Sequence, residues 1–267
     1  MIYILTVYWK SNFWVPIQLS NISKFSKGDI EILAFRDADT ENIDLAKFGL
    51  RGRVLSDGGV KSHAEKLNIL AEIVCTEAED DDILVFLDSD AFPITEYESI
   101  LDDALSKYDL CAVRRDENQE PQPHPCFCAL SVKVWKEISG DWRRGPVWED
   151  LDGYKATDVG ARLIYKLANK NKTWRPFLRS NRINLHNAFY GVYEDFLYHH
   201  GAGSRRLVSR LEIRWLTHSR WFNLIPGFIR VRITRYVASK ISKRNLATDE
   251  FVRSQVSDTD KIKKLFL

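Results

Sequence analysis

Mainly apolar runs alternate with amphipathic stretches through the first third of the chain. Buried strands are predicted at residues 2–8, 30–35 and 83–87. Helices are predicted between them, at residues 16–25 and 60–74, and the apolar residues of the second helix recur on one face. This alternation of strands and helices is typical of an α/β protein with a largely parallel sheet.

The same pattern continues to the end of the chain in a looser form. Further strands are predicted at residues 110–114, 127–132 and 192–198. Further helices are predicted at residues 96–107, from 134, from 157 or 158 to about 169, 205–221 and 228–243. We therefore expect a Rossmann-like, mixed but mainly parallel sheet flanked by helices, followed by a C-terminal helical extension.

Composition supports a folded domain and directs attention to two charged regions. The 267 residues are 45% hydrophobic and 12% aromatic, which excludes a disordered chain. The net charge is only +2, so no nucleic-acid partner is expected from bulk charge. Residues 77–103 are rich in acid, whereas residues 204–244 are rich in Arg and Lys. This asymmetry predicts a cation site in the middle and an anionic partner near the end.

The cysteines and the apolar segments bear on the compartment. Cys126 and Cys128 are two residues apart, which is the period of a strand and not the usual spacing of a zinc site. The N-terminal apolar run lacks a basic leader, and no stretch reaches the roughly 18 apolar residues of a membrane-spanning helix. We expect a cytoplasmic protein with reduced thiols.

The most informative motif follows the third strand of the predicted sheet, where Asp88-Ser89-Asp90 ends the apolar run. Ligands of open α/β sheets bind at the carboxyl ends of the strands. Two carboxylates on the same side of an extended chain suit Mg²⁺ or Mn²⁺, which prefer oxygen ligands. A capped turn without metal is the alternative, because Asp and Ser are common turn residues.

Residues 83–94, which read ILVFLDSDAFPI, resemble the Asp-x-Asp segment of glycosyltransferases with the GT-A fold. The order of elements extends this resemblance over residues 1–205. It implies that Asp88 and Asp90 hold a divalent cation, Mn²⁺ or Mg²⁺, on the diphosphate of a nucleotide sugar, with a UDP-sugar favoured. It also implies a nucleotide-binding half at about residues 1–115 and an acceptor-binding half at about residues 116–205, with residues 206–267 as a basic helical extension.

A second motif lies at residues 199–206, which read HHGAGSRR. Its glycines permit close backbone approach to a ligand, and its arginines suit an anion; a solvated Gly-rich turn is the alternative. The segment resembles the metal-binding His-x-x-Gly-x-x-Lys of glycogenin-like and related galactosyltransferases. The resemblance assigns His200 as the third metal ligand, with His199 as the second choice, and Arg206 as the phosphate-binding cation.

Three further residues are expected near the nucleotide. Thr6 lies toward the end of the first strand, where the base is expected. Asp37 follows the second strand and resembles the acid of GT-A enzymes that hydrogen-bonds uracil; a solvated loop acid is the alternative. Lys66 lies on the helix before the metal-binding strand, where it faces either the donor or solvent.

Two acids are candidates for the catalytic base that deprotonates the acceptor hydroxyl. Asp158 precedes a predicted helix and matches the position of the base in inverting GT-A enzymes. Asp150 fits the acid-pair pattern of the family. Both are alternatively helix caps. We favour an inverting over a retaining course, and the sequence leaves the choice open.

The sequence thus predicts a metal-dependent transferase that moves a sugar from a nucleotide sugar to a glycan or lipid-linked acceptor. Basic and apolar residues interleave at 221–243, which predicts either peripheral contact with an anionic membrane, at its inner face, or packing on the catalytic domain. A nucleotidyltransferase or other metal-dependent phosphoryl enzyme is one alternative. A non-catalytic basic membrane-binding module is another, although it leaves both motifs unexplained.

Overall fold

A seven-stranded sheet forms the centre of the computed structural model, which describes residues 1–149, 153, 155–217 and 219–267. The strands lie in the order β10-β6-β7-β4-β1-β2-β3. Their bounds are β1 Ile2–Tyr8, β2 Ile30–Arg36, β3 Gly52–Ser56, β4 Ile83–Asp88, β6 Leu110–Val113, β7 His124–Ser131 and β10 Trp174–Phe177. Only β7 runs antiparallel to its neighbours. The expected α/β class with a mixed, mainly parallel sheet flanked by helices is confirmed.

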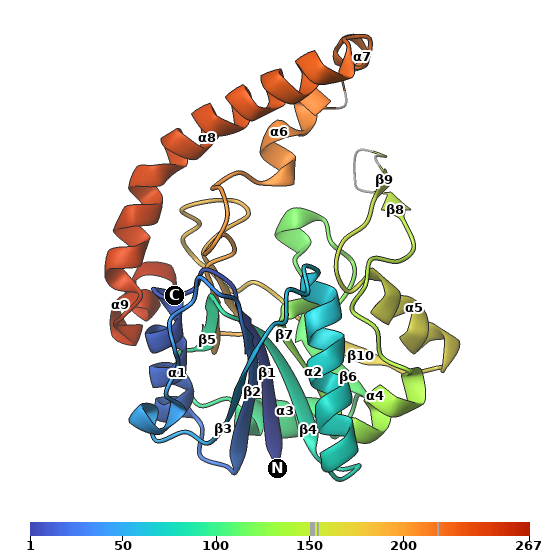
Figure 1. Cartoon of the computed structure of the whole chain (residues 1–267), viewed down its shortest axis with the longest axis vertical. Helices are drawn as coiled ribbons and strands as arrows, with labels where there is room; N and C mark the ends of the chain where they lie inside the picture. The colour runs from blue at the N-terminus through green and yellow to red at the C-terminus, as the bar shows by residue number, and fades with distance from the viewer. Residues whose placement is uncertain (150–152, 154, 218) are drawn as a thin grey trace.

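Helices cover both faces of this sheet (Figure 1). On one face, α1 (Trp14–Phe25) and α3 (Glu98–Leu105) contribute Leu19, Ile22 and Leu101 to a core with Ile4 and Ile32 of the sheet. On the other face, the core is formed with α2 (His63–Glu77), α4 (Val132–Ile138) and α5 (Ala161–Asn169). Two short 3₁₀ helices, η1 (Leu45–Phe48) and η2 (Asp116–Asn118), lie in connecting loops.

A second, three-stranded sheet extends from the carboxyl end of β4. It consists of β11 (Gly191–Tyr193), β12 (Leu197–His199) and β5 (Ala91–Pro93), in that order. The single strand predicted at residues 192–198 is therefore wrong, because Glu194 and Asp195 adopt positive φ angles and turn the chain into a hairpin. A further pair, β8 (Trp148–Glu149) and β9 (Lys155–Ala156), flanks the residues outside the described ranges.

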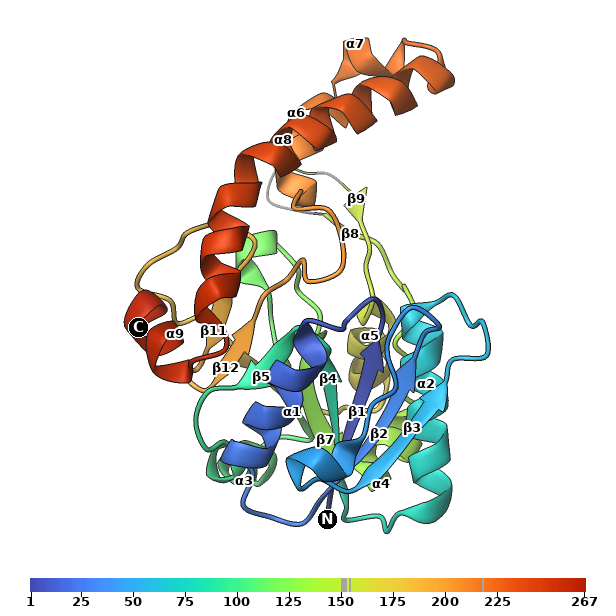
Figure 2. The same cartoon turned by 60° about the vertical axis from the view of Figure 1, so that its left-hand side comes forward.

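The C-terminal region first extends away from the sheet as an arm and then runs back to the domain (Figure 2). Helices α6 (Arg210–Thr217), α7 (Arg220–Asn223) and the first half of α8 (Gly227–Gln255) extend away from the sheet. The end of α8 and α9 (Thr259–Phe266) then pack on the domain, where Val252 and Phe266 join Trp14 in a third buried cluster. In the described ranges, no helix is long and apolar enough to cross a membrane.

Candidate functional site

The two aspartates lie where the sequence placed them, at the carboxyl end of a central strand. Asp88 is the last residue of β4, and Asp90 immediately precedes β5. The side-chain amide of Gln18 donates hydrogen bonds to the backbone carbonyls of Asp88 and Ala91, each at 2.7 Å. Helix α1 thus holds both ends of the turn that carries the acid pair.

The second sheet brings a histidine to the acids. Strand β12 pairs antiparallel with β5, and His199 lies opposite Ala91, the residue after Asp90. Its Nε2 lies 3.5 Å from an oxygen of Asp90 and 3.9 Å from an oxygen of Asp88. One ligand atom from each of the three side chains lies within 4.8 Å of the others, so the three can converge on one cation.

His200, which the sequence favoured as the ligand, lies elsewhere. Consecutive strand residues point to opposite faces, so the neighbour of His199 is directed into the core. His200 is fully buried, with Nδ1 2.9 Å from the hydroxyl of Tyr198 and Nε2 2.7 Å from Asp249 of α8. Likewise Arg205 lines the pocket, whereas Arg206 is exposed and outside its lining. The structure therefore brings together the residues one position before those that the sequence favoured.

A glycine loop encloses the carboxylate of Asp90. The backbone N–H groups of Gly201 and Gly203 donate to the same Asp90 oxygen, at 3.1 and 2.8 Å. Gly201 has a φ of +84°, which favours glycine, and a Cβ on Gly203 would lie 2.6 Å from the Cβ of Asp90. Both glycines are thus required for this approach of the loop to the acid.

The surroundings of Asp90 keep it ionised. Burial alone would raise its pKa, but the neighbouring His199, His200 and the Gly203 N–H hold the pKa well below its usual range. The Asp88 carboxylate is more exposed and is 3.0 Å from Nε2 of His63. One buried and one partly exposed carboxylate, together with an imidazole nitrogen, form a donor set that suits Mn²⁺, Mg²⁺ or a similar divalent ion.

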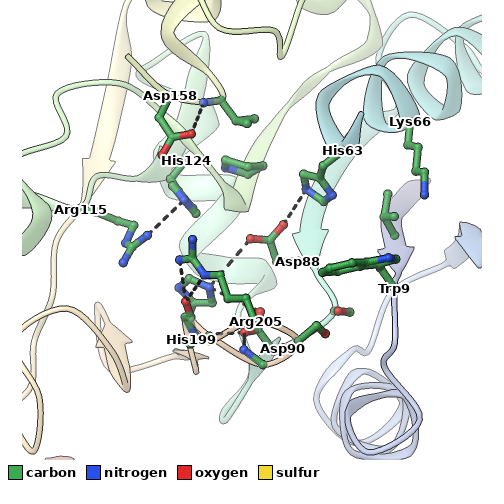
Figure 3. Close-up of a pocket in the computed structure, with 18 of the residues that line it drawn as sticks. Trp9, His63, Lys66, Asp88, Asp90, Arg115, His124, Asp158, His199 and Arg205 are labelled. Carbon is green, nitrogen blue, oxygen red and sulfur yellow. Dashed lines mark hydrogen bonds and ion pairs between the residues drawn. The ribbon is translucent and has the colours of Figure 1, made fainter. Parts of the chain in front are cut away.

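These residues open into a pocket of about 380 Å³ at the carboxyl edge of the sheet. In Figure 3, His63 and His199 approach the acids from opposite sides, and Asp158 lies across the pocket from Asp90. The lining includes four cationic side chains and one exposed tryptophan, which are Lys61, Lys66, Arg115, Arg205 and Trp9. The pocket therefore combines a cation-binding acid cluster with groups that attract anions.

The sequence did not single out His63, His124 or Arg115 as part of this site. His63 begins α2, which starts at the carboxyl edge, and His124 begins β7, whose antiparallel direction places its start beside the end of β4. Both histidines begin an element at the edge of the sheet that bears the site, and this position is the feature of the sequence from which they could have been predicted. Arg115 is buried, and its guanidinium donates to the carbonyl of Ala188 at 2.9 Å.

His124 is a neutral hydrogen-bonding group in this pocket. Burial, followed by the positive charges of Arg115 and nearby groups, lowers its pKa well below the usual value. Its Nδ1 accepts the backbone N–H of Cys126 at 3.0 Å, and Nη1 of Arg115 lies 3.5 Å from its Nε2. His124 therefore connects the start of β7 to Arg115 in the wall of the pocket.

The remaining predicted residues separate into two groups. Lys66 and Asp158 line the pocket, although Nζ of Lys66 is engaged with Asp57 at 2.5 Å. Thr6 is buried within β1, and Asp37 accepts hydrogen bonds from Thr40 and the Lys10 N–H; both lie outside the pocket lining. Asp150 lies outside the described residues.

Neither a family model nor a curated protein matches this chain. Among solved structures, it is similar to mannosyltransferase PcManGT from Pyrobaculum calidifontis, in complex with GDP-Man and Mn²⁺, at 13% identity and a TM-score of 0.45. That match covers 66% of this chain and 54% of the other. TarS 1-349 from S. aureus, in complex with UDP, is similar at 12% identity and a TM-score of 0.41 over 53% of this chain and 50% of that one.

Mouse xyloside xylosyltransferase 1 is a third such structure, with 11% identity and a TM-score of 0.35, covering 66% of this chain and 78% of that one. The first and the third are glycosyltransferases by name, and the chain spans about half the length of the first two. At these TM-scores the likeness carries neither family membership nor activity.

Proposed function

We propose that the chain is a glycosyltransferase that binds a nucleotide-diphosphate sugar through a divalent cation held by Asp88, Asp90 and His199. The convergence of these three side chains within 4.8 Å is the observation that carries the proposal. When bound, Mn²⁺ or Mg²⁺ would neutralise charge on the diphosphate oxygens of the donor. We take a UDP-sugar as the first donor to test, as the motif resemblance favours.

The cations of the pocket supply the second part of the donor site. Arg205 is fixed by its hydrogen bonds to the carbonyl of Gly201, at 2.8 and 3.3 Å, on the loop that holds Asp90. Its planar guanidinium can bind phosphate oxygens beside the acid cluster. Lys61 lies nearby in the lining and is solvent-exposed. We assign Arg205, in place of Arg206, to the diphosphate.

Asp158 is the candidate for activating the acceptor. Its carboxylate lines the pocket and accepts only the adjacent N–H of Val159, at 2.8 Å, among the hydrogen bonds of the described residues. It retains acceptor capacity for a sugar hydroxyl, as a general base requires. This role favours inversion, and the acceptor is proposed to be a glycan or a lipid-linked sugar.

The test is divalent-dependent binding of UDP by the full chain, followed by metal-dependent turnover of a panel of sugar nucleotides. Asp88→Asn, Asp90→Asn and His199→Ala should each weaken UDP binding in Mn²⁺ by at least tenfold, as loss of one charge-assisted ligand implies. Asp39→Asn is the matched control, since Asp39 is exposed and outside the pocket.

Unchanged Mn²⁺-dependent binding in all three variants would refute the metal site. The products separate the remaining alternatives. Release of nucleoside diphosphate supports a glycosyltransferase, whereas release of pyrophosphate from a nucleoside triphosphate and a sugar phosphate indicates a nucleotidyltransferase. Binding of neither nucleotide would indicate a non-catalytic module.

A further inference from the structure

The arm, defined here as residues 213–248 and described at 213–217 and 219–248, carries many of the exposed large apolar side chains of the described chain. It comprises most of α6, all of α7 and about the first three quarters of α8. Figures 1 and 2 both show it extending away from the sheet, with α7 at its far end. Leu216 and Phe222 are its buried apolar side chains among the described residues. Arg214 and Asn245 connect the arm to the rest of the chain through Gln119, Leu207 and His186.

Large apolar side chains are concentrated on the outside of this arm. Trp221 is 81% exposed, Leu224 is 77% exposed and Phe228 is 69% exposed. Further exposed apolar residues of the arm are Trp215, Ile229, Val231, Tyr236 and Leu246. Single exposed apolar residues are ordinary, but Trp221, Leu224 and Phe228 occur within eight residues of the chain, between the start of α7 and the start of α8, and such a group marks an interaction surface.

The charge of the arm specifies the chemistry of its partner. No Asp or Glu occurs at residues 213–248, whereas eight basic residues do: Arg214, Arg220, Arg230, Arg232, Arg235, Lys240, Lys243 and Arg244. Arg244 pairs with Glu212, just before the arm, and Arg214 is bonded to Gln119, so the other six are the residues that indicate an anionic partner. A partner must therefore offer negative charge and also accept tryptophan and phenylalanine. Anionic lipid headgroups above an acyl region provide both, because amphipathic rings favour the interface and cations favour the headgroups.

We propose that the arm docks on an anionic phospholipid surface, with Trp221, Leu224 and Phe228 inserted at the interface. The arm rises beyond the carboxyl edge of the sheet, the edge that bears the pocket (Figure 1). A docked arm thus turns the pocket side of the molecule toward the bilayer. The docking is independent of the proposed transferase activity; only the delivery of a lipid-linked acceptor to the pocket rests on it.

The experiment is cosedimentation of the full chain with vesicles of phosphatidylcholine, with and without phosphatidylglycerol. We expect binding to the anionic vesicles only, and weaker binding as salt is raised. Arg232→Glu with Arg235→Glu should lower the partition coefficient roughly 25-fold or more, since each basic residue contributes about fivefold. Trp221→Ser with Phe228→Ser should lower it by about tenfold.

Matched controls lie on the rest of the surface. Tyr165→Ser alters an aromatic side chain of α5 that is 56% exposed, and Lys170→Glu with Lys264→Glu reverses two exposed charges outside the arm. These variants should bind vesicles like the unaltered chain. All variants should keep Mn²⁺-dependent UDP binding, so failure of docking is distinguishable from failure of the proposed function.

Three outcomes would overturn the proposal. One is equal vesicle binding by arm and control variants. Another is equal binding to neutral and anionic vesicles. The third is a lipid-free dimer in sedimentation velocity that Trp221→Ser with Phe228→Ser dissociates, because the apolar surface would then be covered by a second copy of the chain. Point substitutions are used in preference to deletion, since residues beyond 248 belong to the domain core.

Discussion

His199 and His200 are adjacent in the sequence but lie in different environments, because successive side chains of an extended chain point to opposite faces. At the end of β12, alternation directs His199 toward the acid pair and the next residue, His200, toward α8. The sequence motif contains both residues and does not state which face of a strand each one occupies. Pairing of β12 with β5 supplies that information, because it fixes His199 opposite Ala91.

We predict that substituting these histidines separates metal binding from stability. His200→Ala leaves the buried carboxylate of Asp249 and the Tyr198 hydroxyl without their imidazole partner. It should lower the free energy of unfolding by about 3 kcal/mol. His199→Ala should change that free energy by less than about 1 kcal/mol without metal, yet abolish stabilisation by Mn²⁺. Urea unfolding with and without Mn²⁺ measures both effects.

His200→Gln is the accompanying control, because it restores a donor toward Asp249 and should recover part of the lost stability. The assignment is wrong if His200→Ala unfolds like the unaltered chain and no longer responds to Mn²⁺, since His200 would then be the ligand.

Residue chemistry made the acid pair predictable, whereas the rest of the site depended on tertiary contacts. Asp88 and Asp90 follow an apolar strand, so their position at the sheet edge followed from the sequence. Arg115 and His124 enter the pocket from β6–β7, and no local pattern relates that segment to residue 199. The ring centroids of His124 and His199 are nevertheless 5.7 Å apart.

At the scale of elements, burial determined which strands could be predicted. β1, β2 and β4 are central and buried, and their apolar runs were read correctly. β3 at one sheet edge and β10 at the other were missed, because their residues are mostly intermediate or exposed and carry no apolar run. The cap of α5 was also wrong, since Gly160, with a φ of +89°, precedes the helix in place of Thr157 or Asp158.

Asp141 connects α2, the loop that follows α4, and α5. Its buried carboxylate accepts hydrogen bonds from Asn68 of α2, from Arg143 and from Arg162 of α5. Burial alone would raise the pKa of Asp141, but the Arg143 and Asn68 hydrogen bonds and then Arg162 hold it well below its ordinary value. The neighbours of Asp158 are bonded to the same loop, because the Gly160 N–H donates to the carbonyl of Trp142 at 2.8 Å and Thr157 donates to the carbonyl of Gly145 at 3.2 Å. We therefore expect this network to stabilise the segment that carries the candidate base.

We predict that Asp141→Asn lowers the free energy of unfolding by about 2–3 kcal/mol at neutral pH, through loss of charge-assisted hydrogen bonds. Because the folded-state pKa is lowered, this contribution is complete above the ordinary value of 3.8 and is lost as the pH falls below it. The difference between the two chains should therefore shrink in acid. Urea unfolding across a pH series measures it.

Asp116→Asn provides the comparison, because Asp116 is an exposed partner of Arg114. Exposed ion pairs contribute little, so this substitution should change the free energy of unfolding by less than about 1 kcal/mol at any pH. If Asp141→Asn lowers the free energy of unfolding by equally little, the Asp141 network does not stabilise the segment that carries Asp158.

At the scale of the whole molecule, we predicted one basic extension after residue 205, whereas the structure shows two parts. The arm is basic and exposed, whereas the end of α8 and α9 belong to the domain. Arg253 donates to the carbonyl of Gly203 at 3.1 Å, and Asp249 binds His200, so this return holds the loop that encloses Asp90. The apolar residues responsible, among them Val252 and Phe266, are widely spaced among charges and gave no clear signal.

We predict that two phenylalanines of this region differ sharply in their effect on stability. Phe266 is fully buried against Tyr198, with ring centroids 5.9 Å apart, whereas Phe228 on the arm is 69% exposed. Phe266→Ala should lower the free energy of unfolding by about 3–5 kcal/mol, the usual range for a buried phenylalanine. Phe228→Ala should change it by less than about 0.5 kcal/mol. Urea unfolding followed by circular dichroism measures both. Vesicle binding should show the reverse ranking, because only Phe228 lies on the proposed docking surface. Equal losses of stability would mean that the arm is part of the core, and its exposed aromatic residues would then no longer indicate a lipid-binding surface.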